Sequence, residues 1–120
     1  TQAEWGPSSN YKGAVSNTDG VANTNKIVAD SPAAQWCRAK GLAWYLPAID
    51  ELKAVYDNKS KLNATLSSPL VGGTQLGTNY YWSSTENNGI EALIFSFSKG
   101  KSTNYSKSNS SCSVRAVRAL

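Results

Sequence analysis

The chain has 120 residues, of which 40% are hydrophobic and 17% charged, with a formal net charge of +4 and a pI of about 9.1. This length provides for one compact domain with a real core and is too short for two, so we interpret residues 1–120 as a single domain. The basic residues are scattered, which argues against nucleic-acid binding. No stretch reaches the ~18 apolar residues that span a bilayer, and we expect no membrane insertion by this domain.

The absence of histidine restricts the chemistry that the chain can perform. It excludes a Ser-His-Asp or Cys-His pair, a His-ligated zinc and a haem histidine. The adjacent carboxylates Asp50 and Glu51 diverge by about 100° on the helix predicted there, so they do not form an acid–base pair. Asp19 is not in the spacing of a calcium loop. We therefore expect no enzymatic activity, no metal and no cofactor.

Two cysteines, Cys37 and Cys112, allow either one disulfide or two free thiols. Cys37 lies in an apolar helical pattern that favours a buried free thiol, whereas an exported chain permits a bridge. Both states stay open at this point. Because the chain begins at Thr1 without an initiator methionine, we expect a processed product.

The first half of the chain predicts short helices separated by turns. We expect a strand at 11–15, a turn at 18–20 and a helix at 21–30. Ser31 and Pro32 are typical of a helix start, and Gly41 marks its end. A buried strand is predicted at 42–46, followed by helices at 48–58 and 59–66, the latter with Leu62 and Leu66 facing inward. Residues 67–79 are predicted to form a glycine-rich loop.

The last third mixes apolar anchors with small polar residues. Strands are predicted at 80–84, 91–99 and 102–107, with turns at 85–89 and 99–101 and a loop at 108–113. From 91 to 99, Leu93, Phe95 and Phe97 fall on one face, predicted to be buried, and the other face is predicted to be outward and carries Ala92, Ile94, Ser96 and Ser98. Twelve of the 27 residues from Asn87 to Ser113 are serine or asparagine.

A closing strand is predicted at 114–120, with both faces buried except for its arginines. Arg115 and Arg118 would then be partly buried. Because an unpaired buried arginine is costly, we expect each to find a carboxylate such as Glu51 or a carbonyl partner.

Five separated segments carry a family resemblance: TDGVANT (18–24), WYLPAIDEL (44–52), YWSSTE (81–86), FSKG (97–100) and VRAVRAL (114–120). In this order and spacing they resemble the variable proteins of diversity-generating retroelements, in the formylglycine-generating-enzyme branch of the C-type lectin fold. The resemblance implies an α+β fold of two or three short helices around a twisted antiparallel sheet, with neighbouring termini. Residues 1–79 are then a scaffold, and 80–120 a variable-region-like hairpin and closing strand.

The resemblance also implies that adenines of the gene's 3′ end are replaced at random. An AAC codon altered in this way reaches 15 residue types and never a stop. The residues that we place on the outward face all belong to this set, and we interpret all but the last as ligand-binding: Asn87, Asn88, Ile90, Ile94, Ser96, Ser98, Ser102, Asn104, Tyr105, Ser106, Ser108, Ser111 and Cys112. Tyrosine and serine are also favoured in antibody loops.

The sequence departs from the family pattern at two places. Leu93 stands where relatives often carry tryptophan, and neither Cys37 nor Cys112 matches the catalytic cysteine pair of the enzymes. Sugar-binding Glu-Pro-Asn and Gln-Pro-Asp tripeptides are also absent.

These observations favour a non-catalytic ligand-binding or adhesion module. Its expected place is extracellular, on a bacterial surface or at a phage tail tip, with a protein or glycan ligand on another cell or host surface. Two alternatives stay open: a structural lectin-like domain of a surface or pilus protein, and a carbohydrate-binding lectin.

Overall fold

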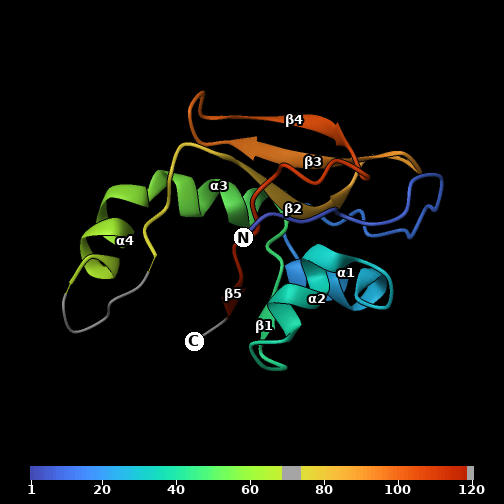
Figure 1. The fold of residues 1–120 in the computed structure, drawn as a ribbon, viewed down its shortest axis with the longest axis horizontal. Coiled ribbons are helices and arrows are strands. Elements are labelled where there is room, and N and C mark those ends of the chain that lie inside the picture. The colour runs from blue at the N-terminus through green and yellow to red at the C-terminus, as the bar shows by residue number, and fades with distance from the viewer. Residues whose placement is uncertain (69–73, 119–120) are drawn as a thin grey trace.

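The computed structural model describes residues 1–68 and 74–118. The described residues form four helices, α1 (Gly20–Ile27), α2 (Pro32–Arg38), α3 (Ile49–Asp57) and α4 (Lys59–Leu66), and five strands, β1 (Trp44–Tyr45), β2 (Tyr80–Glu86), β3 (Glu91–Ser96), β4 (Lys101–Ser106) and β5 (Val117–Arg118). The predicted α+β class is confirmed, although two or three helices were expected. Figure 1 shows the three longer strands together on one side of the molecule and the helices on the other.

The longer strands form an antiparallel sheet in the order β2-β3-β4. In its register Phe95 lies opposite Tyr81 on β2 and opposite Ser102 on β4. The pairing between β2 and β3 shifts between Trp82 and Glu86, which marks a bulge. The predicted turn at 85–89 was therefore too early, because Thr85 still belongs to β2. The order leaves β4 at the sheet edge.

The helices begin where capping residues stand. Ser31 accepts a hydrogen bond from the Ala34 N–H at 3.1 Å, and Pro32 occupies the first helical position, as predicted. Asp19 caps α1 by accepting from the Ala22 N–H at 3.0 Å. The predicted helix at 21–30 ends early, at Ile27. The helices predicted at 48–58 and 59–66 are present as α3 and α4.

The segment before α1 is irregular, and the strand predicted at 11–15 is wrong. The backbone of this segment forms hydrogen bonds with one buried side chain, that of Glu86, and is not paired as a strand. The Glu86 carboxylate accepts the N–H groups of Lys12 at 2.8 Å and Ala14 at 3.0 Å, while the Glu86 N–H donates to the Ala14 carbonyl at 2.7 Å. Gly13 between them has a φ of +76°, which interrupts an extended conformation.

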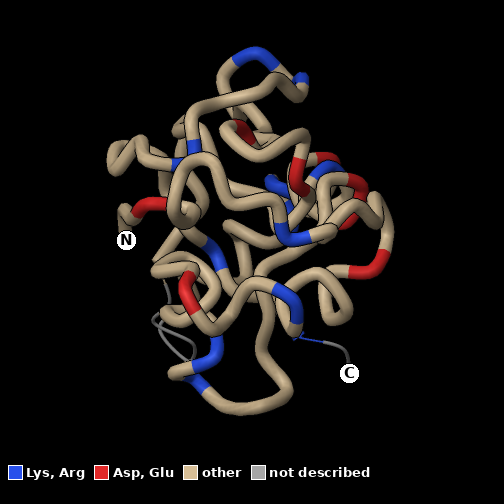
Figure 2. The backbone as a smooth tube through the Cα atoms, turned by 90° about the vertical axis from the view of Figure 1, so that its right-hand side faces the viewer, with Lys and Arg blue, Asp and Glu red and all other residues tan. Residues whose placement is uncertain are grey.

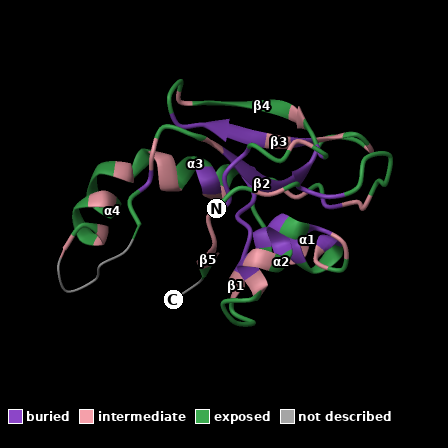
Figure 3. Cartoon of the chain, in the orientation of Figure 1, coloured by how far each residue is buried: buried purple, intermediate pink, exposed green. Residues whose placement is uncertain are grey.

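The sheet packs on both faces. A first core lies against α1, α2 and the N-terminal segment and includes Trp5, Ile27, Cys37, Trp82 and Ile94. A second core lies against α3 and includes Leu52, Tyr81, Phe95 and Phe97. Figure 3 shows β3 mostly buried, with Glu91 and Leu93 half-buried, while β4 beside it is almost entirely exposed. Strand β3 is therefore the central structural element of the domain.

The two strands predicted at 42–46 and 114–120 are much shorter than expected. Only Trp44 and Tyr45 pair with Arg118 and Val117, and Leu42 is exposed. Before β5, Ser113 pairs with β2 and not with β1: its N–H donates to the Tyr80 carbonyl at 2.8 Å. Residues 119 and 120 lie outside the described part of the chain.

Of the two kinds of partner predicted for the arginines, Arg115 has the carbonyl, and neither arginine pairs with Glu51. The Glu51 carboxylate accepts hydrogen bonds from the Gly20 and Ala48 N–H groups and from the Tyr45 hydroxyl. Arg115 instead donates to the Thr74 carbonyl, and the Arg118 guanidinium lies 5.4 Å from the centre of the Trp44 ring. The carboxylate thus joins α1 and α3 directly.

Helix α4 contributes no buried residue, so the inward placement predicted for Leu62 is wrong and Leu66 is only half-buried. The glycine-rich loop predicted at 67–79 falls partly on residues 69–73, which lie outside the described residues. The resemblance implies neighbouring termini, and the Val114 N–H, four residues before the end of the described chain, donates to the Thr1 carbonyl at 2.8 Å (Figure 1).

Candidate functional site

Nine of the twelve predicted ligand-binding residues are exposed in the structure. We call them the polar strip, and they are Asn87, Asn88, Ile90, Ser98, Ser102, Asn104, Ser106, Ser108 and Ser111. They lie on β4, on the β2–β3 and β3–β4 turns and on the loop that follows β4 (Figure 1). Except for Ile90 their side chains are neutral hydroxyls and amides, which donate and accept hydrogen bonds.

Strand β4 is exposed because it projects beyond the layers that cover β3. Ser102 and Asn104 lie opposite Phe95 and Leu93, and therefore on the side of the second core. Thr103 lies opposite Ile94, on the side of the first core. None of these three β4 residues is covered by a helix or loop. An edge strand with short side chains on both faces offers both side-chain and backbone groups to a ligand.

The outward placement of Ile94 and Ser96 is wrong. Ile94 is fully buried and Ser96 is 2% exposed. The physical reason is that β3 is the middle strand and has a core on each face, so alternation along it separates one core from the other. The Ser96 hydroxyl lies 3.1 Å from the Ser98 hydroxyl and accepts from the Lys99 N–H at 3.2 Å, which stabilises the β3–β4 turn.

Two further predicted positions are also less exposed than expected. Tyr105 is half-buried, and its ring packs edge-on against Tyr80 with 5.5 Å between the centroids. Cys112 is 1% exposed and belongs to the first core. Membership of the set of residues reached from an AAC codon therefore does not by itself indicate exposure.

The turn between β2 and β3 holds Ile90 in a fixed position. The Asn88 side-chain oxygen accepts from the N–H groups of Ile90 and Glu91, each at 2.8 Å. The Ile90 carbonyl accepts from the Lys107 N–H at 2.9 Å. Ile90 is nevertheless 56% exposed. Asn88 thus stabilises the turn, and the turn exposes the aliphatic side chain of Ile90.

At the opposite end of the strip, Ser98 and Ser111 line an open hollow of about 390 Å³ together with Gln2, Thr78, Asn79 and Tyr80. The Gln2 side chain donates to the Ser111 carbonyl at 3.0 Å. Sequence reasoning missed Gln2, Thr78 and Asn79 because they lie outside the serine- and asparagine-rich segment. The resemblance implies neighbouring termini, but no local pattern indicates that Gln2 itself lies beside residue 111.

Sequence reasoning also missed a buried ion pair beneath the strip. The Lys107 ammonium lies 2.5 Å from Glu86 Oε2, donates to the Asn10 carbonyl at 3.1 Å and lies 4.7 Å from the centre of the Trp5 ring. Neither Lys107 nor Glu86 has an exposed side chain. The pair fastens the end of β4 to β2 and to the N-terminal segment. A lysine between two serines is typical of a solvated surface, so the sequence gives no sign of this role.

Both cysteine thiols of the chain are buried and are not part of the exposed strip. Cys37 and Cys112 are free thiols, and burial raises their pKa to about 12 and about 11, respectively. The described residues contain no cluster of three or more His, Cys, Asp or Glu side chains that would hold a metal ion. Figure 2 shows lysines and arginines at separated positions along the backbone. Within the same residues, no helix is long and apolar enough to cross a membrane.

The fold and this surface define the class: a small α+β domain that presents an uncharged polar strip on a rigid, doubly packed sheet. The family model of the Lcl C-terminal domain matches residues 1–118. The chain therefore belongs to the Lcl C-terminal domain family and is a lectin-like domain. No curated protein and no solved structure matches it.

Proposed function

We propose that this domain is a non-catalytic ligand-recognition module whose binding surface is the polar strip, carried on a C-type lectin-like scaffold. The observation that carries the proposal is the contrast between β3 and β4. Strand β3 is mostly buried and has a core on each face, whereas β4, its neighbour in the same hairpin, is exposed on both faces. Apart from Lys101 and the half-buried Tyr105, β4 carries only short polar side chains. A rigid support with an exchangeable surface is the arrangement that antibody-like recognition requires.

Diversification of the strip is part of the proposal. All nine strip residues belong to the set that an AAC codon reaches when its adenines are replaced. Strip side chains make hydrogen bonds within the domain at the turns, through Asn88 and Ser98, and at and after the end of β4, where Ser106 bonds Ser108 and Ser111 bonds Asn109. Substitutions on β4 itself, at Ser102, Asn104 and Ser106, would change the ligand without removing a core contact.

The ligand is proposed to be a protein or a glycan on another cell or host surface, and the domain to act outside the cell that produces it. Hydroxyls and amides suit either ligand, because both present hydrogen-bonding groups. The alternative of a purely structural lectin-like domain would leave the strip without a partner. The nine positions would then have no function beyond solubility.

A displayed library tests the proposal. The nine strip codons are replaced by NNC, which is the set of codons that AAC yields, and the library is selected against a protein probe, lysozyme, and a neutral polysaccharide probe, dextran. We expect folded binders to at least one probe. A matched library varies nine exposed positions on and beside α3 and α4: Asp50, Lys53, Ala54, Asp57, Asn58, Ser60, Lys61, Ala64 and Ser67. Equal success of both libraries, or no folded binder from the strip, would contradict the proposal.

The lectin alternative has its own test. A glycan array probed with the unaltered domain, with and without a chelator, separates two kinds of lectin. Binding that the chelator abolishes indicates a calcium-dependent lectin, and binding that it leaves unchanged indicates metal-independent sugar recognition through the strip or elsewhere. Loss of chelator-resistant binding on Ser102→Lys or Asn104→Lys would assign it to β4.

A further inference from the structure

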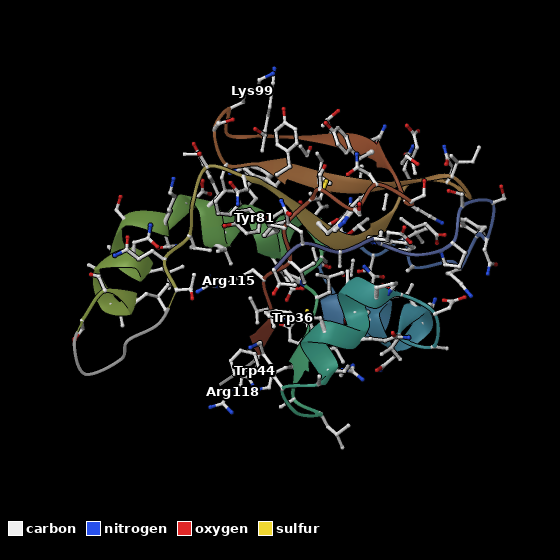
Figure 4. All side chains as sticks on the ribbon, viewed as in Figure 1. Trp36, Trp44, Tyr81, Lys99, Arg115 and Arg118 are labelled. Carbon is white, nitrogen blue, oxygen red and sulfur yellow. The ribbon has the colours of Figure 1, made fainter. Side chains whose placement is uncertain are left out.

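A groove of about 820 Å³ lies on the side of the molecule away from the β3–β4 turn. One wall is formed by α2 and β1 and the other by α3 and α4, with residues 114–117 between them. Figure 4 shows Trp36, Trp44 and Arg115 gathered there around β1 and β5, while Lys99 lies at the far end of the molecule. The groove shares no residue with the polar strip.

The groove is lined mostly by apolar side chains. Trp36 and Trp44 lie on one wall, and Leu62 and Leu66 on the other, with Leu76 completing the lining of the second wall. All except Leu76 keep part of their surface accessible. A volume of this size and an apolar lining are typical of sites for small organic ligands, which occupy about 300–1,000 Å³. The lining therefore favours a ligand with an apolar body.

Cations surround this lining, and two of them lie on the tryptophans. The Lys40 ammonium is 4.4 Å from the centre of the Trp36 ring, and the Arg118 guanidinium lies over Trp44. Arg115 lines the groove itself, and its guanidinium donates to the Thr74 carbonyl. A guanidinium has five N–H donors, so this bond leaves donors for an anion.

No acidic residue balances these charges within the described residues. The groove lining there contains no Asp or Glu. The ion pairs found in the described chain join Lys12 with Asp30, Lys53 with Asp57 and Lys107 with Glu86, and none involves a groove cation. Residues 69–73 and 119–120 contain no acidic side chain in the sequence. The electrostatic complement of the groove is therefore an anion.

We propose that the groove binds an amphipathic organic anion, with its apolar body along Trp36 and Trp44 and its carboxylate or sulfate group at Arg115 and Lys40. Burying the apolar body removes hydrocarbon from water. The head group forms charge-assisted hydrogen bonds, which are about twice as strong as neutral ones. This activity goes beyond the recognition proposed for the strip and involves separate residues, so each proposal stands or fails alone.

Three probes with the same ten-carbon chain test the proposal: decyl sulfate, decanol and decyltrimethylammonium, each below its micelle concentration. Binding is followed by tryptophan fluorescence and by titration calorimetry. We expect decyl sulfate to bind with a Kd at least about tenfold lower than decanol, and the ammonium probe not to bind. Equal affinity for the three probes, or no binding of decyl sulfate up to its micelle concentration, would overturn the proposal.

Variants assign the head-group site. Arg115→Gln and Lys40→Gln should each raise the Kd of decyl sulfate, by about tenfold for Arg115, and leave that of decanol unchanged. Lys99→Gln removes one positive charge on the β3–β4 turn and serves as the matched control, for which we expect no change (Figure 4). Circular dichroism shows that each variant is folded. Because Arg115 also bonds Thr74, Lys40→Gln keeps the test decisive if Arg115→Gln unfolds. An effect of Lys99→Gln equal to those of both groove variants would contradict the assignment.

Discussion

The Lys107 ammonium and the Glu86 carboxylate form an ion pair in which neither side chain is exposed, and this pair joins the end of β4 to the end of β2. The two oxygens of the Glu86 carboxylate also accept hydrogen bonds from the backbone N–H groups of Lys12 and Ala14. A buried pair of this kind stabilises little against an apolar substitute, but loss of one partner leaves an uncompensated buried charge. The pair therefore connects the end of β4, which carries part of the strip, to β2 and to the N-terminal segment.

Replacement of Lys107 tests this relationship. Lys107→Met should lower the free energy of unfolding by about 3–5 kcal/mol, because the Glu86 carboxylate stays buried without its cation. Urea denaturation at pH 7 measures the change. The matched control is Lys53→Met, which removes an exposed ion pair with Asp57 on α3. We expect the control to leave the urea midpoint nearly unchanged, and equal shifts in the two variants would contradict the buried placement.

Two isoleucines only four residues apart provide a second test. Ile94→Ala should lower the free energy of unfolding by about 2–5 kcal/mol, because Ile94 is fully buried in the first core. Ile90→Ala, at a position that is 56% exposed, should change it by less than about 0.5 kcal/mol. Thermal or urea unfolding of both variants measures the difference. A similar decrease in the free energy of unfolding for both variants would contradict the assignment of Ile94 to the core and of Ile90 to the strip.

Two glycines with the same backbone conformation differ in the space around them. Gly100 has a φ of +71°, and a Cβ placed there would lie 2.8 Å from the Tyr56 hydroxyl, whereas Gly13, with a φ of +76°, has open space. In both alanine variants, backbone strain should lower the free energy of unfolding by about 1–2 kcal/mol. Gly100→Ala should lose at least about 1 kcal/mol more, because the Tyr56 ring is packed against Phe95 and Phe97 and does not move freely. Chemical denaturation compares the two, and the reverse order would contradict the packing of the β3–β4 turn.

The buried thiols predict a loss of stability in alkaline solution. Their pKa is raised from 9.0 to about 12 for Cys37 and about 11 for Cys112 in the folded protein. Above pH 9 the unfolded chain therefore binds fewer protons than the folded one, and the free energy of unfolding falls with rising pH until the folded thiols ionise. By pH 10.5 the loss is on the order of 1–2 kcal/mol for each thiol. The Tyr45 pKa, raised to about 12 by burial and then by Glu51, adds to the decline.

The Cys37→Ala, Cys112→Ala double variant measures the share of the thiols. Its free energy of unfolding should fall less between pH 8 and pH 10.5 than that of the unaltered protein. Thiol titration of the unreduced protein complements this comparison: we expect two reactive thiols in denaturant and almost none in the folded state. Absence of thiols in denaturant would show that the cysteines are bridged.

Local signals predicted the helices well. The Ser31-Pro32 start, the two helices after Pro47 and the turn around Gly100 depend on residues close in sequence, and the structure places them where the local pattern does. The apolar alternation of residues 91–99 also predicted β3, although the strand ends at Ser96.

The exposure of the predicted site residues depended on the tertiary fold and was predicted less well. Alternation in β3 was taken to separate core from solvent, but a second core covers the other face, so Ile94 and Ser96 are buried. The same limit hid the Lys107–Glu86 pair and the approach of Gln2 to Ser111, because both contacts depend on how separate segments pack and not on residues adjacent in sequence. The alternation of residues along a strand separates its two faces, but it does not indicate whether each face is covered by other elements or open to solvent.

The polar strip is proposed to vary between isolates while the buried sheet beneath it stays constant. The most direct measurement of this difference is the sequence of the 3′ end of the gene, with flanking DNA, from several isolates. We expect substitutions confined to the codons of exposed strip positions such as Ser102, Asn104 and Ser106, unchanged codons for buried residues such as Phe95, and a nearby near-copy that carries adenines at the variable sites. Substitutions spread evenly over strip and core, without such a copy, would contradict the account.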